Sequence, residues 1–381
     1  MEWIRFNEPY GNEDIFKKAE KMTRNHLFEP ETVLEQLTKR FLSLDLYKDS
    51  GVPFFMQSGT AALEIMALAM NIQPGDEIII PSFTYPATAN AFLRVGATLV
   101  FADIEPDTCN LDPKSVERVI NGRTRAIVPI HYGGVTADLH ALSNLAASYG
   151  AVLLEDAAHC IGAGYEGKPL GTFGSMGALS FHSSKNITAA GWGGCLLVEN
   201  EEKRNVIEEV IAQGTDRTAF REGRVNAYRW KRLGGEYTMP VHSMAYLEAS
   251  LENLGLVTDR RCELWHRYHS QLHLLETEGK FALCKVPPNA QINGHIFYLL
   301  LKDQKERESL KAYLHERRIE AFTHYEPLHD TVIGESSGRY DGDMPMTMSV
   351  AGRILRLPLH MGLHERDVDQ VCEGVLSFFV H

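Results

Sequence analysis

Three short segments of the chain carry side chains that could work together in one chemical site. Lys185 lies just before a run of small residues, and a lysine in so tight a setting can lose its proton and form a Schiff base with a carbonyl carbon. Asp156 follows a short apolar segment, where a carboxylate is costly to bury unless it pairs with a group such as a protonated ring nitrogen. Gly59 and Thr60 begin a helical segment whose free amides suit a phosphate.

Each of these features also has an ordinary structural explanation. A lone lysine is most often a solvated surface residue, a small-residue turn before a helix often only caps it, and an aspartate after a strand is often a helix N-cap. The order of the features along the chain favours the chemical interpretation. A phosphate cradle, then a strand-end aspartate, then a lysine 29 residues further on is the order found in fold-type I pyridoxal phosphate (PLP) enzymes.

Alternating helices and strands position these residues. The expected helices cover residues 60–72, 86–95, 113–120 and 139–149, and the expected strands cover residues 77–80, 97–101, 125–130 and 151–155. This alternation predicts an α/β fold with a mostly parallel sheet covered by helices on both faces. Such sheets bind ligands at the carboxyl ends of their strands, where Asp156 would lie.

The pattern changes beyond about residue 245. Residues 246–278 are typical of a long charged helix, and the segments that follow are typical of a strand and two helices, at 290–301, 306–318 and 365–379. We therefore expect a large domain over residues 1–245 and a small α+β domain over residues 246–381. No Pro/Ser-rich linker separates them, so the two should pack tightly.

Composition narrows the function classes. The net charge of −12 weighs against non-specific binding to nucleic acid or to an anionic membrane. The six cysteines form no CxxC pair, so neither a metal site nor a redox motif is expected, and buried reduced thiols are the simplest interpretation. No signal-peptide core and no apolar stretch of about 18 residues is evident, so we expect a cytoplasmic protein.

Motifs spread over nearly the whole chain carry a family resemblance. They are Arg5–Pro9, Pro81–Tyr85, Val128–Gly134, Glu155–His159 and Ser180–Asn186. With them the sequence resembles the DegT/StrS-type nucleotide-sugar aminotransferases of the aspartate aminotransferase superfamily. The resemblance implies a fold-type I PLP transferase, with a seven-stranded-type sheet between helices and a smaller C-terminal α+β domain. It also implies that the large domain binds PLP and begins with an N-terminal arm, and that the chain forms a homodimer with active sites at the subunit interface.

The resemblance assigns roles position by position. Lys185 would carry PLP covalently and shuttle protons, with pyridoxamine phosphate as the intermediate form of the cofactor. The other implied cofactor contacts are Asp156 at the pyridine nitrogen, Gly59, Thr60 and Ser180 at the phosphate, Tyr85 stacked on the ring, and His159 at the ring's edge. The chain departs from the family pattern at Trp192, where a Glu is common, and over residues 235–239, which lack the Asn of the segment that reaches the partner's phosphate site.

Within the family, the likeness is greatest to enzymes that make dTDP-4-amino-4,6-dideoxygalactose. It is carried by Gly214–Arg217, Gly223–Trp230 and His324–His329. The implied reaction moves an amino group from L-glutamate to a dTDP-4-keto-6-deoxyhexose, leaving 2-oxoglutarate, for bacterial surface polysaccharide synthesis. Guanidinium groups match a diphosphate or a carboxylate, so the substrate-binding candidates are Arg217, Arg224, Arg229, His324 and His329. Taken singly, each could be an ordinary surface arginine or turn histidine.

Three alternatives stay open at this point. A sugar dehydratase on the same scaffold typically has His where Lys185 stands, so Lys185 argues against it. An aminotransferase that acts on a 3-keto sugar or on a UDP- or GDP-linked sugar fits the motifs equally well. A non-catalytic PLP-binding regulatory protein is disfavoured because neither a DNA-binding appendage nor a basic stripe is evident.

Overall fold

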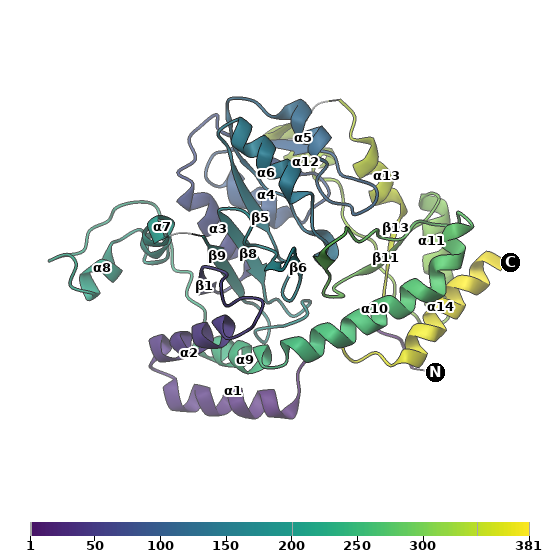
Figure 1. The fold of residues 1–381 in the computed structure, drawn as a ribbon, viewed down its shortest axis with the longest axis horizontal. Coiled ribbons are helices and arrows are strands. Elements are labelled where there is room, and N and C mark those ends of the chain that lie inside the picture. The colour runs from purple at the N-terminus through teal and green to yellow at the C-terminus, as the bar shows by residue number, and fades with distance from the viewer. Residues whose placement is uncertain (1, 200, 341, 381) are drawn as a thin grey trace.

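An eight-stranded sheet forms the centre of the protein in this computed structural model, which describes residues 2–199, 201–340 and 342–380. Across the sheet the strands are ordered β1, β9, β8, β5, β4, β2, β3 and β12 (Figure 1). Their bounds in that order are Val52–Met56, Gly194–Val198, Met176–Ser180, Val152–Asp156, Thr124–Ile127, Glu77–Pro81, Thr98–Ala102 and Gly338–Tyr340. Six neighbouring strands from β8 to β12 are parallel, and β9 pairs antiparallel with both β8 and β1.

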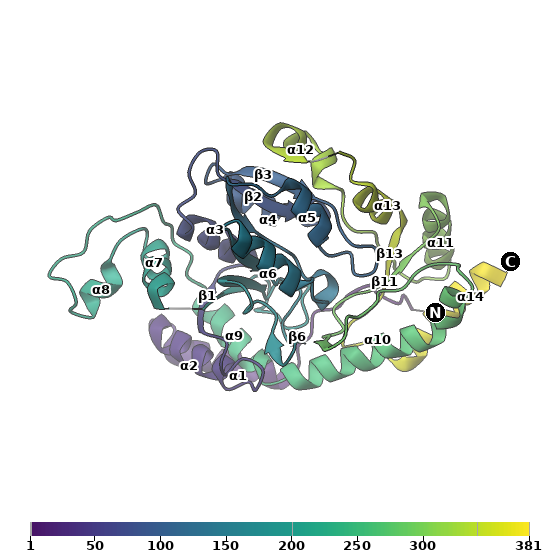
Figure 2. The same cartoon turned by 45° about the horizontal axis from the view of Figure 1, so that its top comes forward.

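Both faces of the sheet are buried, because alternate side chains of each strand enter different cores. In β2, Ile79 packs into one core, while Ile78 and Ile80 pack into the other. Helices α3 (Gly59–Ala69), α4 (Pro86–Leu93) and α7 (Glu201–Ile211) cover one face. The other face is covered by α1, α2, α5, α6 and α9, with bounds Glu13–His26, Pro30–Leu42, Pro113–Val119, Leu139–Ser148 and Val241–Leu251. Figure 2 shows this layering from a second direction.

The chain after α9 builds a third core beside the sheet. The long helix α10 (Leu254–Thr277) packs along α14 (Glu365–Val380), and β11 (Phe297–Leu300) pairs antiparallel with β13 (Ile354–Leu357). The remaining elements of this half are β10, α11, η2, α12 and α13, with bounds Ala290–Gln291, Gln304–Glu316, Leu328–Asp330, Val332–Ser337 and Pro345–Arg353. In the large half, the short strands β6 (Gly164–Tyr165) and β7 (Lys168–Pro169) pair with each other, and β10 pairs with β6. The short helix η1 covers Tyr132–Gly134.

The predicted α/β fold class is confirmed, with one difference in the sheet. An eighth strand, β12, comes from the C-terminal half of the chain and pairs in parallel with β3, so the sheet is wider than the expected seven-stranded type. The expected helix over 246–278 is divided into α9 and α10 at Asn253, whose side-chain amide donates to the Ala249 carbonyl. The division of the chain at residue 245 stays a prediction, and β12 shows that the two halves are interlaced.

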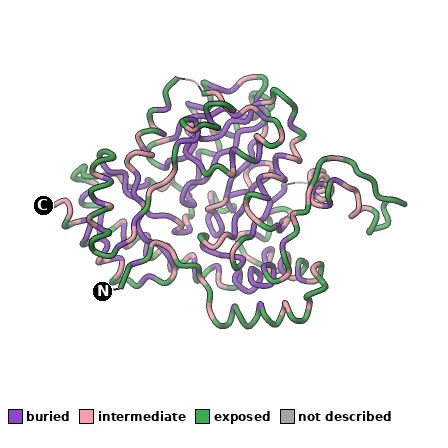
Figure 3. The backbone as a smooth tube through the Cα atoms, turned by 180° about the vertical axis from the view of Figure 1, so that it is seen from behind, coloured by how far each residue is buried: buried purple, intermediate pink, exposed green. Residues whose placement is uncertain are grey.

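One segment projects from this body. Between α7 and α9 the chain runs outward through α8 (Arg217–Arg221) and returns (Figures 1 and 2). Its residues are largely exposed, as the green tube at the edge of Figure 3 shows, whereas the strands are buried. We call residues 213–238 the projecting arm. Within the described ranges, no helix is both long and apolar enough to cross a membrane.

Candidate active site

A cavity of about 520 Å³ opens at the carboxyl ends of the parallel strands. Strands β5 and β8 each end in a residue of its wall, Asp156 and Ser180, and the first turn of α3 forms another part. The C-terminal half closes the opposite side with His295, His324 and Arg356. The cavity therefore lies where the fold predicts a ligand site, and both halves of the chain build it.

Asp156 is buried at the end of β5 and is held by two hydrogen bonds. Its Oδ2 accepts from Thr88 Oγ1 at 2.6 Å, and its Oδ1 accepts from the Ala158 backbone N–H at 3.1 Å. The Thr88 hydroxyl is itself 3.1 Å from Thr84 Oγ1. No lysine, arginine or histidine of the described ranges forms an ion pair with this carboxylate. A buried aspartate that is oriented but lacks a cation suits a ligand that carries one.

Lys185 lies in the loop that leaves β8. The loop is closed by backbone hydrogen bonds, including Phe181 N–H to the Gly193 carbonyl at 2.8 Å and Lys185 N–H to the His182 carbonyl at 2.9 Å. Burial lowers the pKa of the Lys185 amine from its usual 10.5 to about 8, although the nearby Asp156 charge opposes that shift. A substantial fraction of the amine is therefore neutral near pH 7 to 8 and can act as a nucleophile or a base.

The start of α3 approaches the end of β8 very closely. A Cβ on Gly59 would lie 2.9 Å from Ser180 Cβ, and a Cβ on Gly194 would lie 2.2 Å from the Ser58 carbonyl oxygen. Ser58 caps the helix by accepting from Ala61 N–H at 3.0 Å. The glycines therefore let the helix N-terminus, with its free amides, reach the cavity beside Ser180, which suits a phosphate group.

Three imidazole rings also line the cavity, those of His159, His295 and His324. His159 Nδ1 accepts from Gly133 N–H at 3.2 Å, and its ring lies 4.6 Å from that of His295. The His324 ring stacks on Tyr325 at 3.9 Å, and its Nδ1 is 3.0 Å from Tyr132 Oη. Burial holds the pKa of His159 and His295 well below the usual range and lowers that of His324 to about 2. These rings are therefore neutral at pH 7.

Comparison with known proteins places the chain in a family. Residues 32–376 match the DegT/DnrJ/EryC1/StrS aminotransferase family. The chain belongs to this family. Members of this family use PLP, which is therefore the cofactor of this DegT-type aminotransferase.

Two relatives and one solved structure are similar to the chain over most of its length. The chain is 32% identical to the pleiotropic regulatory protein of Geobacillus stearothermophilus, over 85% of this chain and 84% of that one. It is 30% identical to the spore coat polysaccharide biosynthesis protein SpsC of Bacillus subtilis, over 96% of this chain and 94% of that one. Its fold matches the putative sugar aminotransferase Spr1654 of Streptococcus pneumoniae in its PMP-form with a TM-score of 0.87 and 22% identity, covering 98% of both chains.

The residues of this DegT-type site fit PLP. The cofactor carries an aldehyde, a pyridine nitrogen and a phosphate, and the cavity offers one suitable group for each. Lys185 supplies a readily deprotonated amine, Asp156 a buried carboxylate without a cation, and the α3 N-terminus with Ser180 an anion site. We expect Tyr85, whose exposed ring lines the same cavity 6.5 Å from Tyr325, to cover the cofactor ring.

The lowered pKa of Lys185 predicts how fast the cofactor-free protein takes up PLP. Only the neutral amine attacks the aldehyde, so the rate of covalent attachment should rise with pH and level off above about pH 8. Stopped-flow absorbance of the cofactor at a series of pH values measures this rate. The Lys285→Ala variant, which changes an exposed lysine paired with Asp107, is the matched control. A rate that still rises steeply near pH 10 would contradict the prediction.

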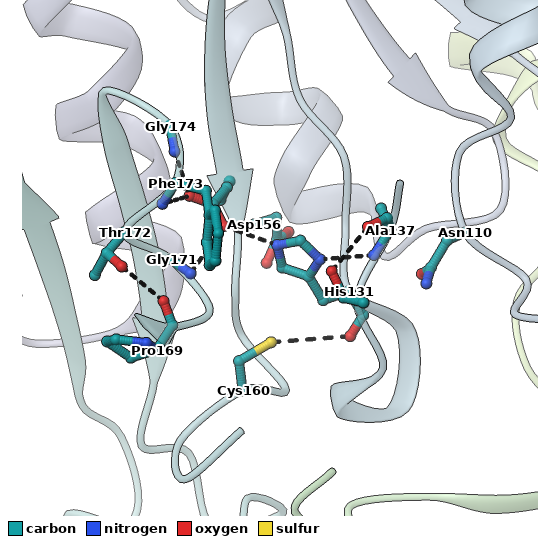
Figure 4. Close-up of polar contacts among 12 residues, drawn as sticks. Asn110, His131, Ala137, Asp156, Cys160, Pro169, Gly171, Thr172, Phe173 and Gly174 are labelled. Carbon is teal, nitrogen blue, oxygen red and sulfur yellow. Dashed lines mark hydrogen bonds and ion pairs between the residues drawn. The ribbon is translucent and has the colours of Figure 1, made fainter. Parts of the chain in front are cut away.

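A buried polar network supports the strand that carries Asp156. The Glu155 carboxylate accepts hydrogen bonds from the N–H groups of Gly171 at 2.8 Å, Phe173 at 2.7 Å and Gly174 at 2.6 Å. It also accepts from His131 Nε2 at 2.9 Å, while His131 Nδ1 accepts from Ala137 N–H (Figure 4). These bonds tie two loops beside the cavity to β5.

Glu155→Gln should therefore lower stability more than it changes the shape of the site. In the variant, the glutamine NH₂ group would face backbone N–H donors that in the wild type donate to the carboxylate. We therefore expect a loss of about 3 kcal/mol in the free energy of unfolding. Urea unfolding followed by circular dichroism measures it. Glu166→Gln, at an exposed residue beside His140, is the control and should change stability little. Equal stability of the two variants would show that the network contributes little.

The structure gathers most of the expected site residues and leaves others apart. The members that line the cavity are Gly59, Thr60, Tyr85, Asp156, His159, Ser180, Lys185 and His324. Their individual roles stay predictions. His329 lies outside the cavity lining: its backbone N–H donates to Ser82 Oγ at 3.0 Å, and its Nδ1 is 2.6 Å from the same oxygen. A structural histidine of a buried turn explains this placement better than a substrate contact.

The three arginines expected to bind substrate lie on the projecting arm. Arg217, Arg224 and Arg229 are absent from the lining of this chain's own cavity, and Arg224 pairs with Glu222 at 2.6 Å. The arm carries them outward, so within one chain they do not reach the site.

Sequence reasoning missed His295 and Arg356 of the C-terminal half. Arg356 is the charged residue of the otherwise apolar strand β13, and a lone charge in a buried strand was a usable signal. His295 follows a short turn at Gly294 and carries no comparable signal, because the segment becomes part of the site only through tertiary packing.

Proposed function

We propose that this aminotransferase moves the amino group of L-glutamate onto a dTDP-4-keto-6-deoxyhexose, giving dTDP-4-amino-4,6-dideoxygalactose and 2-oxoglutarate for surface polysaccharide synthesis. The observation that carries the transaminase chemistry is the pairing, in one cavity, of the low-pKa amine of Lys185 with the cation-free carboxylate of Asp156. The sugar acceptor rests on the motif resemblance and is supported by the name of the Bacillus subtilis relative, a spore coat polysaccharide biosynthesis protein.

Each side chain of the site has a distinct role in such a reaction. PLP supplies an electron sink that stabilises negative charge at a substrate carbon. Lys185, with a pKa near 8, can take a proton from that carbon and return it nearby at neutral pH. Asp156 would pair with the ring nitrogen of the cofactor, and Thr88 fixes the direction of that carboxylate. The α3 N-terminus would hold the phosphate group, so that Lys185 could meet the reacting atoms in a defined orientation.

Arg356 is the group best placed to bind the carboxylate of the amino donor. Its Nη2 donates to the Thr323 carbonyl at 3.0 Å, and its guanidinium lies over the Phe6 ring at 4.7 Å. Its Nε is buried, and no acceptor in the described part of the chain pairs with it. A cavity-lining arginine with an unsatisfied donor fits an anionic ligand group.

Arg356→Lys should therefore weaken glutamate binding selectively. A lysine keeps the charge but loses the planar pair of donors, so we expect the KM for glutamate to rise about 10- to 100-fold with a much smaller change in kcat. Steady-state kinetics with varied glutamate measure both constants. The control is Arg125→Lys at an exposed arginine. An unchanged KM for glutamate would assign Arg356 to another ligand group.

We also propose that the chain acts as a homodimer. The projecting arm exposes large apolar side chains together with its arginines, namely Phe220, Tyr228, Trp230 and Leu233. An exposed apolar segment of this kind fits burial against another protein surface, and a two-fold dimer would bury two such arms. In that arrangement the arm arginines could reach the partner's cavity. Sedimentation equilibrium distinguishes a dimer from a monomer.

One experiment tests the acceptor. The PLP-loaded protein is incubated with glutamate and a panel of 4-keto and 3-keto sugars linked to dTDP, UDP and GDP, and the amino sugars are identified by mass spectrometry and NMR. We expect the dTDP-4-keto-6-deoxyhexose to be aminated at carbon 4. Reaction with UDP-linked, GDP-linked or 3-keto sugars alone would replace the proposed substrate, and conversion of glutamate without any sugar product would place the acceptor outside this class.

A further inference from the structure

Trp192 is a large apolar side chain that stays exposed at the edge of the active-site cavity. Its residue is 69% exposed, although it belongs to the cavity lining. The indole lies beside the His182 ring, with 6.1 Å between the ring centroids and 58° between the ring planes. Burial of an indole is favourable, and here the indole is exposed to solvent at a ligand cavity. A flat ligand that covers it would gain this free energy on binding.

The backbone on both sides of Trp192 is fixed to the strand and loop that precede Lys185. Phe181 N–H donates to the Gly193 carbonyl and Ser183 N–H donates to the Gly191 carbonyl, each at 2.8 Å. Gly191 has a φ of +131°, which favours glycine. The indole is therefore presented from a defined position next to the reactive lysine and not from a free loop.

We propose that the Trp192 indole stacks on a ring of the nucleotide-sugar acceptor and thereby recognises the acceptor but not the amino donor. The inference rests on the proposed function, because it takes the acceptor to be a nucleotide sugar. Such an acceptor carries three rings, the base, the pentose of the nucleotide and the hexose, whereas glutamate carries none. Stacking of a base on an aromatic side chain contributes about 1–3 kcal/mol, so loss of the indole should weaken acceptor binding about 5- to 150-fold.

The test measures acceptor binding and the reaction with the amino donor separately, both in the PLP-loaded enzyme. Trp192→Ala and Trp192→Phe are compared with wild type in calorimetric binding of dTDP and of a hexose 1-phosphate, and in the glutamate half-reaction followed by cofactor absorbance. We expect Trp192→Ala to weaken at least one of these ligands by the stated factor, Trp192→Phe to stay within about threefold, and the glutamate half-reaction to stay unchanged in both. The ligand that loses affinity identifies the ring that stacks.

Trp3→Ala is the matched control, since this exposed tryptophan packs on His315 and is absent from the cavity lining. Unchanged binding of both ligands in Trp192→Ala would overturn the inference, and so would an equal loss in the glutamate half-reaction, which would indicate a structural role. Binding of dTDP does not need turnover. A loss confined to Trp192→Ala would therefore support the stacking site even if no keto sugar on the panel were aminated.

Helix α10 carries a second feature, unconnected with the cavity. His269, His273 and Glu276 follow the helical spacing that places them on one face, and one possible ligand atom from each lies within 4.8 Å of the others. His273 Nδ1 is 3.0 Å from Glu276 Oε2, and the His269 and His273 rings are stacked at 5.6 Å. Leu283 N–H donates to Glu276 Oε1 at 3.0 Å and orients the carboxylate.

We infer that this triad binds a divalent transition-metal ion such as Zn²⁺ or Ni²⁺. Two imidazoles and one carboxylate form a donor set suited to these ions, while Mg²⁺ prefers oxygen ligands and water. The Leu283 N–H acts as a second layer of support that holds the carboxylate in place.

Calorimetric titration of the PLP-loaded protein with ZnCl₂, NiCl₂ and MgCl₂ tests this site. We expect the wild type to bind one more Zn²⁺ or Ni²⁺ ion per chain than the His269→Ala/His273→Ala variant, and Mg²⁺ to bind neither protein at this site. The His140→Ala/His242→Ala variant removes two histidines elsewhere and should bind like the wild type. Equal Zn²⁺ and Ni²⁺ binding by the wild type and the His269/His273 variant would overturn the inference.

Discussion

Lys185→Ala is expected to abolish amino transfer and the visible absorbance of covalently bound PLP. The amine of Lys185 is the one low-pKa lysine amine among the described residues of the cavity lining. Alanine removes both the attachment point and the base that moves protons, so we expect activity to fall by at least about 10⁴-fold, or more than about 5 kcal/mol in transition-state stabilisation. Absorbance spectra and a coupled glutamate assay measure the two losses.

The variant should still bind the cofactor without a covalent bond. Asp156 and the α3 N-terminus remain in place, so PLP should be retained through its ring nitrogen and phosphate and be removed by dialysis more easily than from the wild type. Lys168→Ala, at a residue outside the cavity lining, serves as the control for a lost lysine charge. Full activity in Lys185→Ala would rule out Lys185 as the cofactor lysine, and with it the proposed mechanism.

The apolar runs of the central strands were strong enough signals for the sequence to predict where Asp156 lies in the sheet. The run Ile78 to Ile80 is buried on both faces of the sheet, and such runs between helical segments are typical of a central parallel strand. A strand followed by Asp156 then places a carboxylate at the ligand edge of that sheet. Parallel topology brings the ends of β5 and β8 together, so residues far apart in sequence meet without any further information.

The C-terminal half resisted prediction because tertiary contacts decide its shape. The expected strand over 290–301 is two short strands, β10 and β11, separated by a turn at Gly294. A Cβ on Gly294 would lie 2.6 Å from the Arg261 backbone of α10, and the Arg261 side chain donates to the Gly294 and Leu359 carbonyls. A contact between residues so far apart in sequence leaves no periodic pattern, so the position of His295 in the site could not be foreseen.

The projecting arm shows a different limit. Its arginines were expected at the substrate site because their residue types match a diphosphate, and nothing in the sequence revealed that the arm leaves the body of its own chain. The sequence shows that Trp230 is apolar, but it does not show whether the same chain or another chain buries this side chain. The proposal that the arm lies against a partner subunit therefore depends on its exposed surface, which only the fold displays.

Asp156→Asn is the substitution expected to separate stability from catalysis. Asparagine has nearly the same shape, and its amide can keep the contacts with Thr88 and Ala158 after the Thr88 hydroxyl turns toward Thr84. The negative charge opposite the ring nitrogen is lost, however. Without it the nitrogen has less reason to stay protonated, and the cofactor withdraws electrons less well. We expect activity to fall roughly 1,000-fold, about 4 kcal/mol.

The same change should raise the stability of the cofactor-free protein. Burying the Asp156 charge without a direct ion pair costs free energy in that state, and asparagine removes the cost. The cofactor-free variant should therefore unfold at a higher temperature than the wild type, while its PLP-loaded form is the less active enzyme. Calorimetric scans measure the unfolding temperature, and the coupled glutamate assay measures the activity. ¹⁵N NMR of labelled PLP reports whether the ring nitrogen is protonated. Thr88→Val, which keeps the charge but loses one hydrogen bond, should cost only about tenfold in activity. A loss of both stability and activity in Asp156→Asn would indicate that Asp156 has a structural role. Higher stability of the cofactor-free protein together with lower activity would indicate that the charge destabilises the fold and is kept for the chemistry of the cofactor.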